Sequence, residues 1–136
     1  MPLEHHGLCF GCGQSNLFGL LLEVERTGEG AVAGRWFVKQ DHQGPAPGSA
    51  HPGLLATVLV EAAMLAGGPQ RHPGQVQFEL EPGAALRVGS FCDIQAEISG
   101  NGGDPARARA AASVDGRQIA RLTCSFMNIA TGKEST

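Results

Sequence analysis

The chain has 136 residues, which is enough for one domain with one hydrophobic core and too few for two. Its net charge is −3 and its ten lysines and arginines occur singly, so it lacks the clustered basic face that nucleic acid requires. No stretch approaches the roughly 20 apolar residues of a membrane span, and no secretory leader is evident. We therefore expect a cytoplasmic protein without nucleic-acid or membrane partners, whose four cysteines are reduced thiols.

Residues 17–38 predict two strands joined by a tight turn. In the first of them, LLLEVER, the residues Leu20, Leu22 and Val24 share one face. The turn TGEG at 27–30 reverses the chain, and AVAGRWFV predicts the second strand. The next segment, KQDHQGPAPGSAHPG, is rich in glycine and proline and predicts a loop with a specified path.

Residues 54–66 predict a helix that is apolar almost all round. The segment LLATVLVEAAMLA consists of good helix formers, and Gly67, Gly68 and Pro69 form a stop signal after it. Pro52 suits the first helical position, where its missing N–H costs nothing.

Four further strands are predicted over residues 75–81, 91–99, 106–114 and 117–129. Asp115-Gly116 is a dipeptide favoured in two-residue hairpin turns. One face of each strand is expected to carry the core residues, which are Val76, Phe78, Leu80, Cys92, Ile94, Ala96, Ile98, Ala106, Ala108, Ala110, Ala112, Val114, Ala120, Leu122, Cys124 and Phe126.

An apolar helix must be covered on most sides, and with no second helix a curved antiparallel sheet must wrap it. The alanine row at 106–112 would let the helix sit close to that sheet. The prediction is an α+β fold forming a single domain over 1–136, with an N-terminal segment at 1–16 and a frayed tail at 130–136. An edge strand of such a sheet needs covering, which favours a homodimer.

The segment HQGPAPGSAHPGLLATVLVEAAM resembles the hotdog-fold thioesterases of the phenylacetate-pathway type, and CFGCG followed by NLFGL is similar to the start of one branch of them. The resemblance extends from Cys9 to about Ile129. It implies a hotdog fold, in which a curved antiparallel sheet wraps one central helix. It also implies an acyl-CoA thioesterase, built as a dimer or tetramer with active sites at the dimer interface.

Two departures from that family bear on activity. His51-Pro52-Gly53 stands where the family has His-Gly-Gly, and Val60 stands where it commonly has an aspartate. The neighbouring acid, Glu61, is retained. The resemblance therefore implies a hydrolase with an atypical active site.

Glu61 is the candidate catalytic residue, because a carboxylate among apolar neighbours has a raised pKa suited to a general base. It would activate a water or attack the thioester, while backbone N–H groups near Gly53 and Leu54 hold the oxyanion. The alternative is a structural role, with Glu61 paired to an arginine or a backbone group.

The other candidate site residues flank this helix. His51 would shape the turn that presents the helix N–H groups to the acyl oxygen, or simply cap that turn. Gln43 could reach the thioester from the loop. On the helix, Leu54, Thr57 and Met64 are the candidates for contact with substrate.

Cys9 and Cys12 form one Cys-x-x-Cys pair, whereas a zinc site needs four ligands. His5 and His6 could complete a site with them, or two chains could share one. The family likeness offers a simpler interpretation, a glycine-rich turn leading into the first strand. We therefore expect no metal and no cofactor.

Three functions remain open from sequence. The first is hydrolysis of an acyl-CoA thioester with Glu61 as base or nucleophile. The second is binding of an acyl thioester, or assembly alone, without turnover, which Val60 supports. The third is a hotdog dehydratase or hydratase, suggested by Pro-Gly-Leu-Leu followed by Glu-Ala.

Overall fold

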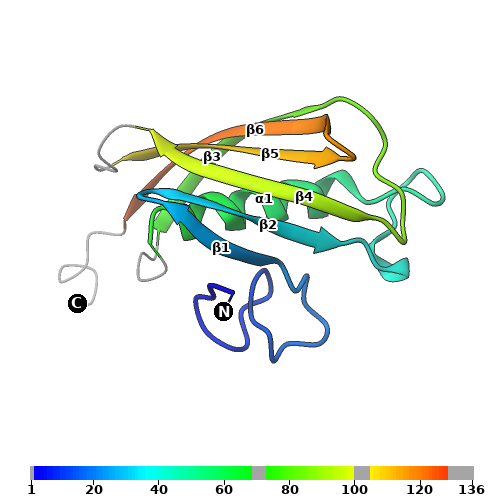
Figure 1. The fold of residues 1–136 in the computed structure, drawn as a ribbon, viewed down its shortest axis with the longest axis horizontal. Helices are drawn as coiled ribbons and strands as arrows, with labels where there is room; N and C mark the ends of the chain where they lie inside the picture. The colour runs from blue at the N-terminus through cyan, green and yellow to red at the C-terminus, as the bar shows by residue number, and fades with distance from the viewer. Residues whose placement is uncertain (1, 69–72, 100–104, 129–136) are drawn as a thin grey trace.

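The computed structural model describes residues 2–68, 73–99 and 105–128. Six strands form one antiparallel sheet in the order β1-β2-β4-β5-β6-β3, and one long helix lies along its concave face (Figure 1). The elements are β1 (Glu23–Gly28), β2 (Ala31–Phe37), the short 3₁₀ helix η1 (Gln40–His42), α1 (Pro52–Ala66), β3 (Pro73–Pro82), β4 (Phe91–Ser99), β5 (Ala106–Val114) and β6 (Arg117–Asn128). This is the predicted hotdog arrangement of a curved sheet around one helix.

One hydrophobic core lies between α1 and the sheet. Trp36 of β2, Ile94 of β4, Leu122 and Phe126 of β6 are buried in it, together with Leu59 of the helix. The helix is held on the sheet mainly by the burial of apolar surface from both. Each Å² of apolar surface removed from water stabilises the fold by about 25 cal/mol. Among the described residues, no helix is long and apolar enough to cross a membrane.

The alanine row of β5 has the role that its small side chains predicted. Ala106, Ala108, Ala110 and Ala112 are all buried, whereas the alternate arginines point to the other face. Because these positions carry only a methyl group, α1 can pack directly over the middle of the sheet.

The hairpin between β5 and β6 forms at the predicted dipeptide. Val114 pairs with Arg117, which leaves Asp115 and Gly116 as a two-residue loop. Both have positive φ, 52° and 79°, as this class of turn requires.

The first strand begins later than predicted. Residues 20–22 lie outside β1, which begins only at Glu23. The backbone N–H of Leu20 donates to Phe10 O and that of Leu22 to Gly11 O, at 2.7 and 2.9 Å, so this stretch bonds to the preceding turn and not to β2. Leu21, with φ 55°, interrupts the extended conformation between them.

Helix α1 begins at Pro52, the position that favours proline, and ends at Ala66. The His51 Nδ1 atom accepts a hydrogen bond from Gly53 N at 2.9 Å and thereby caps the first turn. Gly67 closes the other end, its N–H donating to Ala63 O. The predicted Pro69 stop and the tail at 130–136 lie outside the described residues.

Candidate functional site

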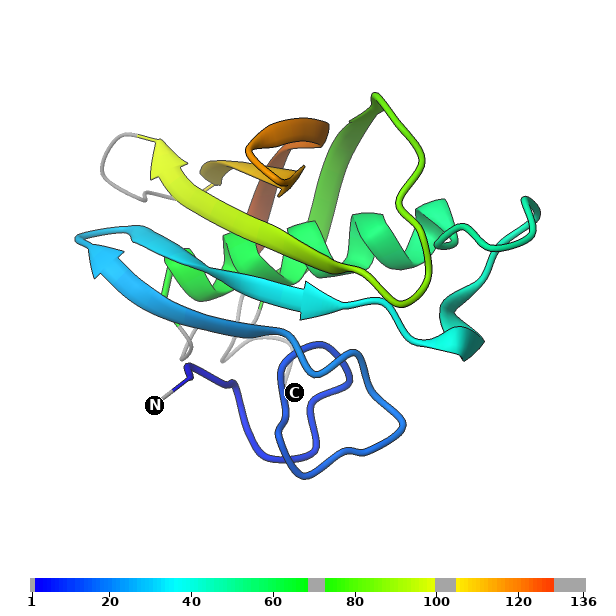
Figure 2. The ribbon, with the colours of Figure 1, turned by 45° about the vertical axis from the view of Figure 1, so that its right-hand side comes forward.

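The N-terminal segment, residues 2–22, lies beside β1 at the edge of the sheet (Figure 2). Its side chains also contact Glu61 of helix α1. Leu3 N donates to Val24 O at 2.8 Å, which fixes the beginning of the segment to the outer edge of the sheet. Further along, Cys12 is fully buried in the core. The segment therefore covers a side of α1 that the sheet leaves open.

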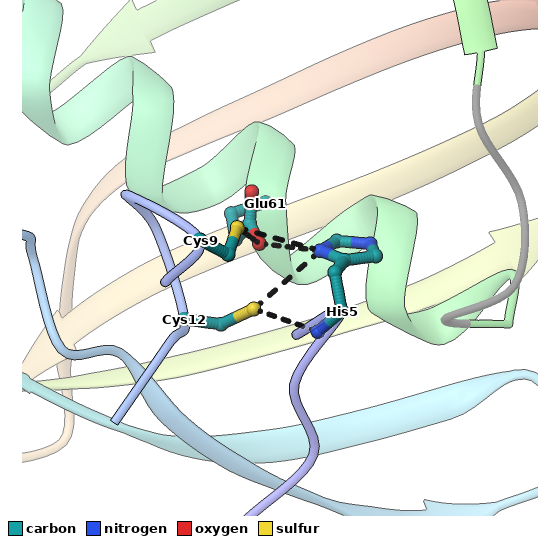
Figure 3. A group of neighbouring side chains, drawn as sticks. All are labelled: His5, Cys9, Cys12 and Glu61. Atoms are coloured by element: carbon teal, nitrogen blue, oxygen red, sulfur yellow. Dashed lines mark hydrogen bonds and ion pairs between the residues drawn. The ribbon is translucent and has the colours of Figure 1, made fainter. Parts of the chain in front are cut away.

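Glu61 lies beneath this segment. It is 5% exposed, and its Oε2 atom is 2.8 Å from His5 Nδ1 and 3.2 Å from Cys9 Sγ (Figure 3). A buried carboxylate must be paired or neutralised, and here the partners come from a loop about fifty positions earlier in the sequence.

Cys12 completes a group of four side chains. Its Sγ atom is 3.4 Å from His5 Nδ1 and accepts a hydrogen bond from the His5 backbone N–H at 3.1 Å. One ligand atom from each of His5, Cys9, Cys12 and Glu61 lies within 4.8 Å of the other three. We call these four residues the His-Cys-Cys-Glu cluster.

The groups of the cluster change one another's pKa values. The hydrogen bond to Glu61 raises the pKa of His5 to about 9, against the opposing effect of burial. Burial raises the pKa of Glu61, but hydrogen bonds from His5, Cys12 and Cys9 outweigh it, so the carboxyl pKa falls below its usual value. Burial also raises the pKa of the Cys12 thiol well above its usual range. Without a bound cation, the pair is therefore imidazolium and carboxylate.

The glycines of the Cys-Phe-Gly-Cys-Gly turn allow its backbone to close on itself. Gly13 N donates to Cys9 O at 2.8 Å, and a Cβ on Gly13 would lie 2.4 Å from Gly7 O. Only glycine fits there without moving the backbone. The turn places both cysteine side chains near His5 and Glu61.

The exposed side of α1 carries other residues. Gly53 and Thr57 are exposed, and Val60 and Met64 are half-buried. At about 100° per residue these four lie in one narrow stripe, which we call the open stripe. Glu61 is one step round the helix from Val60, on the flank beneath the N-terminal segment. The position at which the resembling family has its aspartate thus faces outward, and Glu61 does not share it.

The predicted oxyanion donors at the helix start already have acceptors. Gly53 N donates to the His51 ring, and Leu54 N donates to His51 O at 3.0 Å. The His51 side chain caps the first turn of the helix.

Two of the predicted substrate contacts also have internal partners. The Gln43 amide donates to Gln40 O at 3.0 Å and accepts from Gly48 N at 2.7 Å, which holds the loop together. The Thr57 hydroxyl donates to Gly53 O at 2.8 Å. Thr57 and Met64 lie together on the open stripe, Leu54 lies beside it, and Gln43 is on the loop before the helix.

An open groove of about 600 Å³ lies on the opposite, outer face of the sheet. Two exposed ion pairs line it, Arg109 with Glu97 at 2.7 Å and Arg121 with Glu81 at 2.6 Å. The groove contains neither a predicted site residue nor a member of the His-Cys-Cys-Glu cluster. The candidate site therefore lies at the helix and not in this groove.

The fold is that of solved hotdog thioesterase structures. A thioesterase superfamily protein matches with a TM-score of 0.75 and 18% identity over 85% of this chain, which spans 60% of that protein. Phenylacetic acid degradation protein PaaI from Thermus thermophilus, solved as a mutant, matches with a TM-score of 0.67 and 21% identity over 79% of this chain and 93% of that protein.

A hypothetical thioesterase from Streptococcus pneumoniae, solved with coenzyme A, matches with a TM-score of 0.69 and 19% identity over 79% of this chain and 84% of that one. No protein-family model matches the sequence, and no curated protein matches it. At these identities, the likeness establishes the shared fold.

Proposed function

We propose that the protein is a hotdog dimer that binds an acyl-CoA thioester beside the open stripe of α1, without hydrolysing it through Glu61. The fold supports the ligand class, since structural neighbours are thioesterase superfamily proteins and one of them was solved with coenzyme A. The observation that carries the proposal is the contrast between Val60, which lies on the open stripe, and Glu61, which is covered.

The edge of the sheet supports the dimer. β3 is the last strand of the sheet and pairs only with β6 among the described strands. Val76 and Phe78 pair with the buried Phe126 and Cys124 and so face the helix side, yet they are 36% and 53% exposed. A second copy joined along β3 would cover this apolar strip and close a cleft beside the open stripe.

Such a cleft suits an acyl chain. Val60 and Met64 provide apolar surface along the stripe, and Leu54 extends it toward the helix start. Thr57 adds one exposed hydroxyl. Ligand sites are commonly apolar clefts with few polar groups, which matches this composition.

Hydrolysis needs a base and an oxyanion site, and the structure uses the predicted groups elsewhere. The Glu61 carboxylate bonds to His5 and Cys9, and the N–H groups of Gly53 and Leu54 bond to His51. A general base must come within hydrogen-bond reach of the water that it activates. These contacts favour binding over turnover.

Hydrolysis of the acyl-CoA remains the second candidate, because the structural neighbours are described as thioesterases. It would require the N-terminal segment to release Glu61 toward the cleft, or a water held on the open stripe.

The test combines binding and turnover. Phenylacetyl-CoA and acyl-CoAs of short, medium and long chains are titrated calorimetrically, and free coenzyme A is followed by mass spectrometry. We expect saturable binding of at least one thioester and no release above the buffer rate, for the wild type and for Glu61→Gln alike. Met64→Glu, with a charge on the stripe, should weaken binding at least tenfold, whereas Phe91→Glu on the outer face should not.

Other outcomes overturn the proposal in specific ways. Turnover by the wild type that Glu61→Gln abolishes would establish the hydrolase, and hydration of an enoyl-CoA would establish the hydratase. Failure to bind any thioester at millimolar concentration would exclude the proposed ligand class. A further variant, Val60→Asp, places a carboxylate on the open stripe. It should increase hydrolysis if a thioester binds there.

A further inference from the structure

We propose that the His-Cys-Cys-Glu cluster is a structural zinc site that fastens the N-terminal segment to helix α1. All four ligands belong to one chain, so the zinc site does not depend on a bound acyl thioester. It differs from the expectation drawn from sequence, which favoured a metal-free turn.

The ligand types fit zinc. Two cysteine sulfurs, an imidazole nitrogen and a carboxylate oxygen are all common zinc donors. Thiolates select against magnesium and calcium, which prefer oxygen ligands, while the nitrogen and oxygen donors distinguish the set from a four-cysteine iron–sulfur site. A mixed set of this kind points to tetrahedral Zn²⁺.

The distances also fit. With Zn–S bonds of about 2.3 Å and Zn–N and Zn–O bonds of about 2.0–2.1 Å, a tetrahedron separates its ligand atoms by roughly 3.3–3.8 Å. His5 Nδ1 is 3.7 Å from Cys9 Sγ and 3.4 Å from Cys12 Sγ, and Cys9 Sγ is 3.2 Å from Glu61 Oε2. The 2.8 Å hydrogen bond between His5 and Glu61 must open by roughly half an ångström on the tetrahedral values above. Every pair of ligand atoms in the cluster lies within 4.8 Å.

The surroundings support deprotonated sulfur. The backbone N–H of His5 donates to Cys12 Sγ, a contact that stabilises a thiolate and orients it as outer-shell hydrogen bonds do in metal sites. A metal-bound thiol loses its proton, so both cysteines would coordinate as thiolates. The site holds two thiolates, one carboxylate and a neutral imidazole around a divalent cation.

The site is closed, which makes it structural and not catalytic. All four tetrahedral positions come from the protein, so no position is left for water or substrate. Cys12 and Glu61 are buried, while His5 and Cys9 are half-buried. The metal would join an irregular segment that forms no strand before Glu23 to the middle of the central helix.

The test is the metal content of the full chain, purified after removal of any affinity tag. We expect about one zinc per chain by plasma mass spectrometry, and less than a tenth of that in Cys9→Ser and Cys12→Ser. His6→Gln is the matched control, because His6 is exposed and only its neighbour His5 belongs to the cluster. The control should retain full zinc.

Cobalt provides a second measurement that does not depend on the variants folding. Wild-type protein loaded with Co²⁺ should show the intense visible bands of a tetrahedral site and a sulfur-to-cobalt charge-transfer band with the intensity of two thiolates. Chelation should then speed chymotrypsin cleavage at Phe10 and Phe18 of the released segment. Zinc-free wild type that takes up no Co²⁺, or equal zinc in the cysteine variants, would overturn the proposal.

Discussion

The backbone of Gly11 lies directly against the side chain of Glu61. A Cβ built on Gly11 would fall 2.5 Å from Glu61 Cδ and 2.6 Å from Cγ, closer than such atoms approach. The N-terminal segment and the helix therefore pack so closely at Gly11 that a methyl group there would clash with Glu61. The contact lies beside the carboxylate that the His-Cys-Cys-Glu cluster uses.

We expect Gly11→Ala to displace the N-terminal segment from α1. Overpacking a tight contact typically costs about 1–3 kcal/mol, and here the added methyl must move either the turn or Glu61. Urea unfolding should show this loss, and amide hydrogen exchange should increase across residues 2–22. Gly28→Ala is the control, because nothing lies within 4 Å of a Cβ at Gly28. Equal stability of the two variants would contradict the packing described.

The alanine row of β5 provides a second prediction. Ala110 is 4% exposed and faces the helix between Ala96 and Leu122, so Ala110→Leu should destabilise the protein by about 1–3 kcal/mol through overpacking. Ala111 is the next residue on the same strand and points to the outer face between Gln95 and Arg121. Ala111→Leu should change the stability by less than about 0.5 kcal/mol. Chemical denaturation of both variants measures the difference, and a similar loss in both would contradict the assigned faces.

Much of the fold could be predicted because its signals are local. Strict alternation placed Cys92 and Cys124 inside, and burial now raises the pKa of each thiol to about 11, as expected of inert core residues. The single apolar helix required a sheet around it. The start of β1 could not be predicted, because alternation in Leu20 and Leu22 reflects their burial, with backbone bonds to Phe10 and Gly11, and not strand pairing.

The sequence indicated the two parts of the His-Cys-Cys-Glu cluster only separately. The Cys9 and Cys12 spacing suggested metal ligands, which His5 or His6 could join, whereas Glu61 was an isolated carboxylate on an apolar helix. Each part lacked partners that the other could provide. Nothing local in the sequence indicates that a segment about fifty residues earlier folds back onto the helix, so the pairing depends on tertiary structure.

His42 should make the stability depend on pH. The residue is 5% exposed, and its ring is stacked on Trp36 with centroids 5.5 Å apart and accepts a hydrogen bond from Lys39 N at 3.0 Å. Burial lowers the pKa of His42; the nearby Asp41 carboxylate opposes this shift and the Lys39 ammonium adds to it. The imidazole is therefore neutral in the folded protein.

Because the unfolded histidine has a pKa near 6.5, the unfolded state binds a proton that the folded state does not as the pH falls through about 6.5. The free energy of unfolding should therefore fall below that pH, by up to about 1.4 kcal/mol per pH unit from this group. His42→Gln retains a hydrogen-bond acceptor and should remove that part of the slope. Urea unfolding from pH 7.5 to 5.5 provides the measurement, and the other groups cancel in the comparison. Parallel curves for the two proteins would contradict a buried neutral His42.

The exposed apolar strip on β3 predicts which edge joins two copies. Phe78 faces the helix side of the sheet at its free edge, where it would be covered by a second chain. Replacing it with a charge places an unpaired carboxylate in that contact, which costs several kcal/mol if the contact forms. We expect Phe78→Glu to sediment as a monomer at concentrations where the wild type is a dimer or a tetramer.

Phe91 provides the matched control, because it is equally exposed, at 52% against 53% for Phe78, but lies on the outer face. There its ring packs against Phe37 and beneath the Arg35 guanidinium, whose carbon is 4.4 Å from the ring centroid. Phe91→Glu should therefore keep the β3-linked dimer, even if contacts between dimers through the outer face are lost. A wild type that sediments only as a monomer would leave the open stripe of α1 without its second wall. The acyl-thioester cleft would then have to be abandoned, whereas the zinc site, built within one chain, would be unaffected.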